Sequence, residues 1–201
     1  MELLTAGLLE RRRDDAGRET LRVTDAGLQV LAAALQKNRA ARDAHEQLVQ
    51  RVAIDMQRAG RLVWRGLSLR APLSADDGST GWAMAMPDVY SIRHTTVEDY
   101  VEPVVHEIKV RRADLLSDLR QTSKRAAYLA LSSQCWYVLK AGIGQVEEIP
   151  PECGVMLAHE ADLEVARPAP RRAMRLVFGT WMALARATSE PPLDEGAQGQ
   201  F

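Results

Sequence analysis

The chain has 201 residues, 46% of them hydrophobic, and its 26 basic side chains nearly balance its 27 acidic ones. This length allows one full domain with an appendage or two small domains, and the composition is too apolar for a disordered chain. No run approaches the roughly 20 apolar residues of a membrane helix, and the first residues lack the pattern of a secretory signal. We therefore expect a cytoplasmic protein that does not span a membrane.

Charge alternates along the chain. Residues 36–70 hold eight Lys or Arg against three Asp or Glu, whereas residues 71–102 hold one against six. The basic excess returns over 103–140, and residues 141–164 carry six acidic side chains and no Lys or Arg. An ordinary solvated surface explains this pattern, and so do basic flanks that hold a phosphate backbone beside an acidic metal site.

The first 35 residues are expected to form a small unit. An Asp-Asp-Ala-Gly turn at 14–17 separates two short arms, which predicts a β-hairpin, and Thr24 or Asp25 then caps a helix. This order of helix end, arginine-rich hairpin and helix resembles the back half of a winged-helix domain of the MarR-like type. The first two helices of such a domain have no counterpart here. We assign residues 1–38 to this segment and infer no sequence-specific DNA binding from it.

An α/β pattern follows. The expected elements are a helix over 36–59, strands over 62–69, 83–92 and 104–110, a helix over 112–132, strands over 135–139 and 154–158, and a helix over 171–187. A polar loop is expected over 71–81, and Pro87 bends the second strand. This order predicts an α/β layer fold with a mixed sheet over 39–168. The C-terminal helix segment is assigned to 169–188, and a disordered tail over 189–201 completes the chain.

The third strand carries the side chains with the clearest chemistry. Glu107 and Lys109 share one face because side chains alternate at period two, and Asp88 follows the bend of the preceding strand. Asp88, Glu107 and the backbone carbonyl of Ile108 are candidate ligands of one Mg²⁺ or Mn²⁺. Lys109 is the candidate catalytic lysine, which would orient or deprotonate a bound water or stabilise phosphate charge. The alternative is an ion pair on the strand face, with Asp88 in a turn.

These residues carry a family resemblance. Pro87-Asp88, followed nineteen positions later by Glu107-Ile108-Lys109 on an apolar strand, resembles the motif of the PD-(D/E)xK nuclease superfamily. Several separate stretches look like the MmcB-like family of presumed bacterial DNA-repair endonucleases, namely 106–120, 124–128, 135–138 and 149–155. The resemblance covers residues 42–168. It implies a restriction-endonuclease-like core of a helix, a three-strand meander, a helix and two further strands.

The resemblance also implies roles for further residues. Glu46 occupies the place of an acidic residue on the first helix that assists the metal site, and Gln121 or Lys124 would add a polar group from the next helix. Each is otherwise a solvated surface residue. For Asp114 and Asp118, capping or pairing with arginines is favoured over metal binding. The candidate DNA contacts are Arg111, Arg112, Arg120 and Lys124.

The resulting hypothesis is a metal-dependent DNA endonuclease in DNA repair or genome defence, with Mg²⁺ or Mn²⁺ as cofactor and DNA as partner. A homodimer or a repair-protein partner is compatible with it. A catalytically silent DNA-binding or scaffold protein is the first alternative, and a transcriptional regulator whose α/β domain senses a ligand is the second. Cys135 and Cys153 lie in apolar runs and are expected as reduced core thiols.

Overall fold

The computed structural model describes residues 2–14, 17–74 and 80–193. The chain divides into two compact units, Met1–Ala44 and His45–Phe201. Helix α2 (Asp25–Arg58) begins in the first unit and ends in the second. No helix of the described residues combines the length and the apolarity that crossing a membrane requires.

The first unit contains the predicted hairpin. Helix α1 (Glu2–Thr5) precedes strands β1 (Leu9–Arg13) and β2 (Glu19–Val23), which pair antiparallel. Thr24 then caps α2, because its Oγ1 accepts a 3.1 Å hydrogen bond from the N–H of Gly27 and donates to the carbonyl of Gly7. Such a cap satisfies one of the N–H groups that a helix start leaves free. The hairpin, the cap and the long helix are therefore confirmed.

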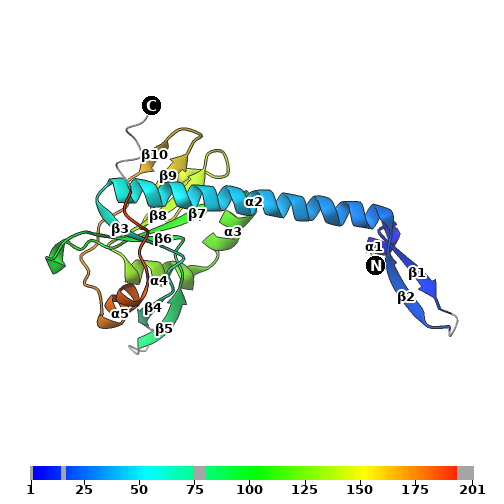
Figure 1. Ribbon diagram of the computed structural model, residues 1–201, viewed down its shortest axis with the longest axis horizontal. Helices are drawn as coiled ribbons and strands as arrows, with labels where there is room; N and C mark the ends of the chain where they lie inside the picture. Colours follow the sequence, from blue (N-terminus) through cyan, green and yellow to red (C-terminus); the bar gives the residue numbers. More distant parts are fainter. Residues whose placement is uncertain (1, 15–16, 75–79, 194–201) are drawn as a thin grey trace. The chain divides into compact units, whose positions relative to one another are not determined.

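The second unit is built on a six-stranded mixed sheet with the strand order β10-β9-β8-β7-β6-β3 (Figure 1). Strands β7, β8 and β9 run parallel, and the remaining neighbours pair antiparallel. The strands are β3 (Arg61–Arg65), β6 (Val89–Arg93), β7 (Val104–Lys109), β8 (Gln134–Lys140), β9 (Gly154–Ala158) and β10 (Leu163–Arg167). The predicted α/β class with a mixed sheet is confirmed.

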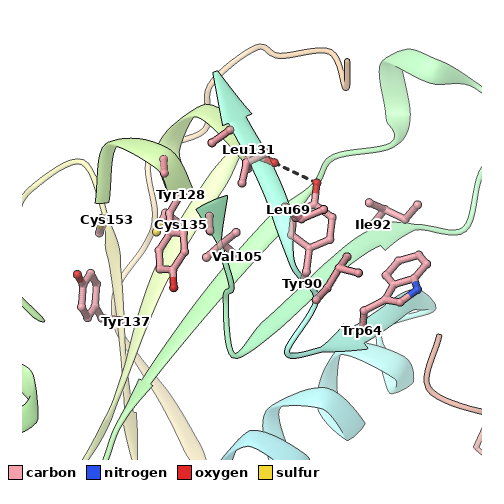
Figure 2. Packing of buried hydrophobic residues seen from close by; sticks show 14 of the residues in the cluster. Trp64, Leu69, Tyr90, Ile92, Val105, Tyr128, Leu131, Cys135, Tyr137 and Cys153 are labelled. Carbon is pink, nitrogen blue, oxygen red and sulfur yellow. Dashed lines mark hydrogen bonds between the residues drawn. The ribbon is translucent and has the colours of Figure 1, made fainter. Parts of the chain in front are cut away.

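Helices cover both faces of this sheet. The second half of α2 packs on one face, where Val52 contacts a layer of sheet residues that includes Ile108. Helices α3 (Arg112–Leu119), α4 (Thr122–Leu131) and α5 (Phe178–Arg186) lie on the other side (Figure 1). There the hydroxyl of Tyr90 donates a 3.0 Å hydrogen bond to the carbonyl of Leu131 within the larger apolar core, as Figure 2 shows.

The predicted loop over 71–81 is wrong at both ends. Strand β4 (Leu69–Ser74) pairs antiparallel with β5 (Thr80–Ala85), and residues 75–79 between them lie outside the described part. Leu69 and Ala71 are fully buried in the core that includes α4, which accounts for strand structure in this segment. The predicted strand over 83–92 is therefore two strands, β5 and β6, with Pro87 between them.

Three further elements differ from the prediction. The helix over 112–132 is broken, because the backbone of Gln121 leaves the helical region at ψ 72°. Strand β10 was not predicted, because this short edge strand has only two large apolar side chains, Leu163 and Val165. The C-terminal helix over 169–188 is confined to Phe178–Arg186, because the N–H of Arg172 binds the carbonyl of Ser133 and keeps the preceding segment out of a helix.

The predicted tail over 189–201 begins with contacts to the sheet. The N–H of Glu190 donates a 2.7 Å hydrogen bond to the carbonyl of Val63 on edge strand β3, and its carboxylate lies 2.8 Å from Nε of Arg65. Disorder is therefore the wrong prediction for this first part, and residues 194–201 lie outside the described residues. Cys135 and Cys153 are both buried and free, as expected of reduced core thiols.

Candidate functional site

The chain that leads into β6 is not in a strand at Pro87, and a bend follows at Asp88. The antiparallel ladder between the two strands ends at Val89. Beyond it, the side chain of Asp88 replaces a backbone partner, because its Oδ2 accepts a 2.7 Å hydrogen bond from the N–H of Ile108. This bond fixes the Asp88 carboxylate beside the Glu-Ile-Lys segment of β7.

Glu107 and Lys109 share one face of β7, and both are buried. The ammonium group of Lys109 donates to Oε1 of Glu107, whereas Oε2 has no hydrogen-bond partner among the described residues. Burial raises the pKa of Glu107, and the nearby charge of Asp88 raises it further. A positive charge brought to Oε2 would therefore relieve an unfavourable burial.

Asp118 of α3 and Lys124 of α4 join this pair. Nζ of Lys124 lies 2.6 Å from Oε1 of Glu107 and 2.6 Å from Oδ1 of Asp118, and Nζ of Lys109 lies 3.4 Å from the same Asp118 oxygen. Burial alone would raise the pKa of Asp118, but the lysines and the hydroxyl of Tyr137 lower it. Glu107, Lys109, Asp118 and Lys124 together are called the lysine–carboxylate cluster below.

Asp118 corrects an interpretation made from the sequence. Capping or arginine pairing was favoured for it, whereas the structure buries its carboxylate between two lysines and a tyrosine. The helix break at Gln121 explains the difference, because a new helix begins there and places Lys124 against Asp118. Asp114 lies exposed in the first turn of α3, four residues before Asp118.

His45, rather than the predicted Glu46, contacts Asp88. Nε2 of His45 lies 3.5 Å from Oδ2 of Asp88, and the hydrogen bond with Asp88 raises the pKa of the imidazole. The carboxylate of Glu46 instead lies 2.9 Å from Nη1 of Arg65. The sequence contained a signal for the contact of His45 with Asp88. Residue 45 precedes buried Leu48 and Val49 by three and four positions, so it shares the helix face that packs on the sheet.

The remaining predicted residues lie around the cluster with different roles. Gln121 is exposed, and its backbone N–H, rather than its side chain, donates a 2.8 Å hydrogen bond to the carbonyl of Asp118. Arg112 forms two 2.5 Å contacts with the carboxylate of Glu148, so its guanidinium has a structural partner. Arg111 precedes α3 and Arg120 follows it, the latter exposed. Of the four arginine and lysine candidates, only Lys124 enters the cluster.

A divalent cation is held by several oxygen or nitrogen donors. Within the described residues, no group of three His, Cys, Asp or Glu side chains is placed to hold a metal ion. Mg²⁺, however, is commonly bound through one or two carboxylates, with water and substrate phosphate completing its shell. The unpartnered Oε2 of Glu107 and the carboxylate of Asp88 are hard oxygen donors that fit this smaller set.

Comparisons with known proteins give little further information. No protein-family model matches the sequence, and no curated protein matches it. Among solved structures, the chain is similar to a protein of unknown function from Silicibacter pomeroyi, with 20% identity and a TM-score of 0.46 over 67% of this chain and 77% of that chain.

Proposed function

We propose that residues 39–168 form a PD-(D/E)xK nuclease core and that the protein is a metal-dependent DNA endonuclease in DNA repair or genome defence. The observation that carries this proposal is the hydrogen bond between the Asp88 carboxylate and the N–H of Ile108. It joins residues twenty positions apart in sequence and sets Asp88 against the Glu107–Lys109 segment. The order of α2, antiparallel β3, β6 and β7, and parallel β8 adds support.

Asp88, Glu107 and the carbonyl of Ile108 would hold Mg²⁺ or Mn²⁺. A divalent cation at this place supplies Lewis-acid chemistry, in that it lowers the pKa of a bound water and neutralises phosphate charge. Asp88 is preorganised for binding, because the Ile108 N–H fixes its Oδ2. Glu107 offers an oxygen that no described group satisfies.

Two lysines would act on the substrate. Lys109 lies on β7 next to Glu107, so its ammonium group is placed to orient the attacking water or to stabilise charge that develops on phosphorus. Lys124 is the more exposed of the two, with 31% of its side chain accessible against 11% for Lys109. We therefore assign Lys124 to the scissile phosphate, and Arg111 and Arg120 to neighbouring phosphates of the DNA backbone.

A second candidate function is a catalytically silent DNA-binding or scaffold protein. The observation that favours it is the pairing within the cluster, where two ammonium groups face two buried carboxylates. Such a network is electrically balanced without a bound metal. In this case the cluster would stabilise the junction of β7, α3 and α4, while Arg111 and Arg120 would still contact DNA.

Cleavage of DNA by matched variants separates the two functions. Supercoiled plasmid, single strands and branched duplexes are incubated with Mg²⁺, Mn²⁺ or EDTA, and the proteins are the wild type, Asp88→Asn, Lys109→Met and Glu46→Gln. The proposal requires cleavage that needs metal, is lost in the first two variants and survives in Glu46→Gln. Thermal unfolding checks that each variant is folded.

Two results would contradict the proposal. Cleavage that persists in both site variants would exclude this site and point to a contaminating nuclease. Salt-sensitive DNA binding by all four proteins, with no cleavage of any substrate, would favour the silent DNA-binding function instead.

A further inference from the structure

The β4–β5 hairpin exposes a stripe of large apolar side chains next to the candidate site. Trp82, Met84 and Met86 are 50%, 69% and 60% exposed. They alternate with Ala83, which packs against the core, and with Ala85, which is buried in it. Exposed apolar side chains that occur singly need no explanation, whereas Trp82 and Met84 share one face of β5 and Met86 follows directly after the strand. We call Trp82, Met84 and Met86 the apolar stripe.

A single cation accompanies the apolar stripe. The guanidinium carbon of Arg70 lies 4.4 Å from the centroid of the Trp82 ring, because Arg70 pairs with Met84 in the ladder and so lies diagonally across from Trp82. Among the described residues of β4 and β5, Arg70 is the one charged side chain. The face therefore combines an aromatic ring, two thioethers and a positive charge.

The apolar stripe is connected to the candidate site through Met86 and Tyr128. The carbonyl of Met86 accepts a 3.1 Å hydrogen bond from the hydroxyl of Tyr128, and the ring of Tyr128 lies 5.4 Å from Nζ of Lys124. Asp88 follows Met86 by two residues. At about 3.3 Å per residue in extended chain, Trp82 lies at most roughly 20 Å from Asp88. This separation is within the reach of one extended nucleic-acid strand.

We infer that the apolar stripe and Arg70 bind an unpaired segment of the DNA strand that enters the candidate site. This inference rests on the proposed nuclease function and names the substrate class, DNA with a single-stranded region. Bases of a duplex are stacked inside the helix, whereas unpaired bases present a π-face to an aromatic ring, whatever their sequence. Arginine adds attraction for phosphate and can stack on a base, and methionine thioethers pack well against rings.

The test is binding in EDTA, so that it does not depend on cleavage. Fluorescence anisotropy is measured with a labelled duplex that carries a single-stranded tail and with the same duplex without the tail. The proteins are the wild type, Trp82→Ala, Trp82→Phe and Arg70→Gln. Tyr100→Ala is the matched control, since Tyr100 is 61% exposed on a different segment, the short 3-10 helix Glu98–Tyr100.

We expect Trp82→Ala to weaken binding of the tailed duplex about tenfold, in keeping with the effect of losing one base–aromatic stack. Trp82→Phe retains a ring and should keep most of the affinity, and Tyr100→Ala should keep all of it. Arg70→Gln should weaken binding and reduce its salt dependence. Binding of the fully paired duplex should change little in any variant.

The outcomes distinguish this inference from the proposed function. Equal affinity of wild type and Trp82→Ala for the tailed duplex would overturn the inference, even if cleavage and its dependence on Lys109 stand. A Trp82-dependent preference for the tailed duplex without cleavage would support the inference while the nuclease function fails. If Trp82→Ala instead changes only the sedimentation of the protein, the apolar stripe contacts a second copy of the chain and the inference is wrong.

Discussion

The hydroxyl of Tyr137 donates a 2.7 Å hydrogen bond to Oδ2 of Asp118. This bond joins strand β8 to helix α3 and leaves the other oxygen, Oδ1, to the two lysines. Asp118 is buried, so each of its oxygens needs a partner to offset the lost hydration. The relationship makes Asp118 the group through which the sheet fixes both lysines of the cluster.

Replacement of Asp118 by Asn should therefore destabilise the protein strongly. The change removes the charge that both lysines face and should lower the free energy of unfolding by about 3 kcal/mol, as expected for a broken buried ion pair. Urea unfolding measures this loss, and Asp114→Asn on the exposed side of the same helix is the control. A loss of unfolding free energy no larger than that of Asp114→Asn would show that the lysines do not depend on Asp118.

Two glycines should respond in opposite ways to replacement by alanine. A Cβ on Gly154 would lie 2.5 Å from Cε3 of Trp136 and 2.6 Å from the backbone nitrogen of Ala169, so Gly154→Ala should cost about 1 to 3 kcal/mol through overpacking. A Cβ on Gly179 in α5 meets nothing within 4 Å, so Gly179→Ala should gain about 0.5 to 1 kcal/mol. Thermal unfolding of both variants tests this prediction, and equal shifts of the unfolding midpoint would contradict it.

The ion pair of Arg112 with Glu148 should make stability depend on acid pH. The side-chain hydrogen bonds from Arg112 and the backbone N–H of Gln145 lower the pKa of Glu148 from 4.5 to about 2. Its contribution to stability is present above pH 4.5 and is lost as the pH falls through about 2. Glu148→Gln should therefore lower the unfolding midpoint at pH 7, and the difference from wild type should shrink below pH 4.5.

Denaturant unfolding across this pH range measures the effect. Glu147→Gln is the control, because Glu147 is the exposed neighbour of Glu148. A difference between wild type and Glu148→Gln that stays constant from pH 7 to the acid limit would show that the ion pair does not stabilise the fold.

His45 and Glu46 should differ in their effect on cleavage. His45→Ala removes the neighbour of Asp88 and should reduce metal-dependent cleavage about tenfold or more, as loss of a group that orients a ligand does. Glu46→Gln breaks an exposed pair with Arg65, so it should leave cleavage unchanged and cost at most about 1 kcal/mol of stability. Initial cleavage rates at saturating Mg²⁺ are compared for the two variants. A larger loss of rate in Glu46→Gln than in His45→Ala would support the role at the metal site that the sequence predicted for Glu46.

Local features of the fold were predictable. The hairpin, the cap at Thr24, the long helix and strand β7 follow from turn chemistry, capping and side-chain periodicity, which act within a few residues of each other. The shared face of Glu107 and Lys109 follows from period two alone. Their catalytic and metal-binding roles stay predictions.

Other features depended on segments distant in sequence. Nothing near Asp118 indicates that Lys124 and Tyr137 will enclose its carboxylate, because the helix break and the parallel pairing of β7 with β8 decide that arrangement. Likewise, Arg112 could bind either DNA phosphate or a carboxylate until packing placed Glu148 beside it.

The sequence by itself determined the α/β order of elements and which residues of each strand share a face, because backbone geometry repeats over short distances. Tertiary structure decided which charged side chains are in contact. These contacts set the environment of Glu107, whose pKa is raised by burial and by the charge of Asp88. Burial and Coulomb interactions depend on where distant segments pack, and no local pattern contains that information.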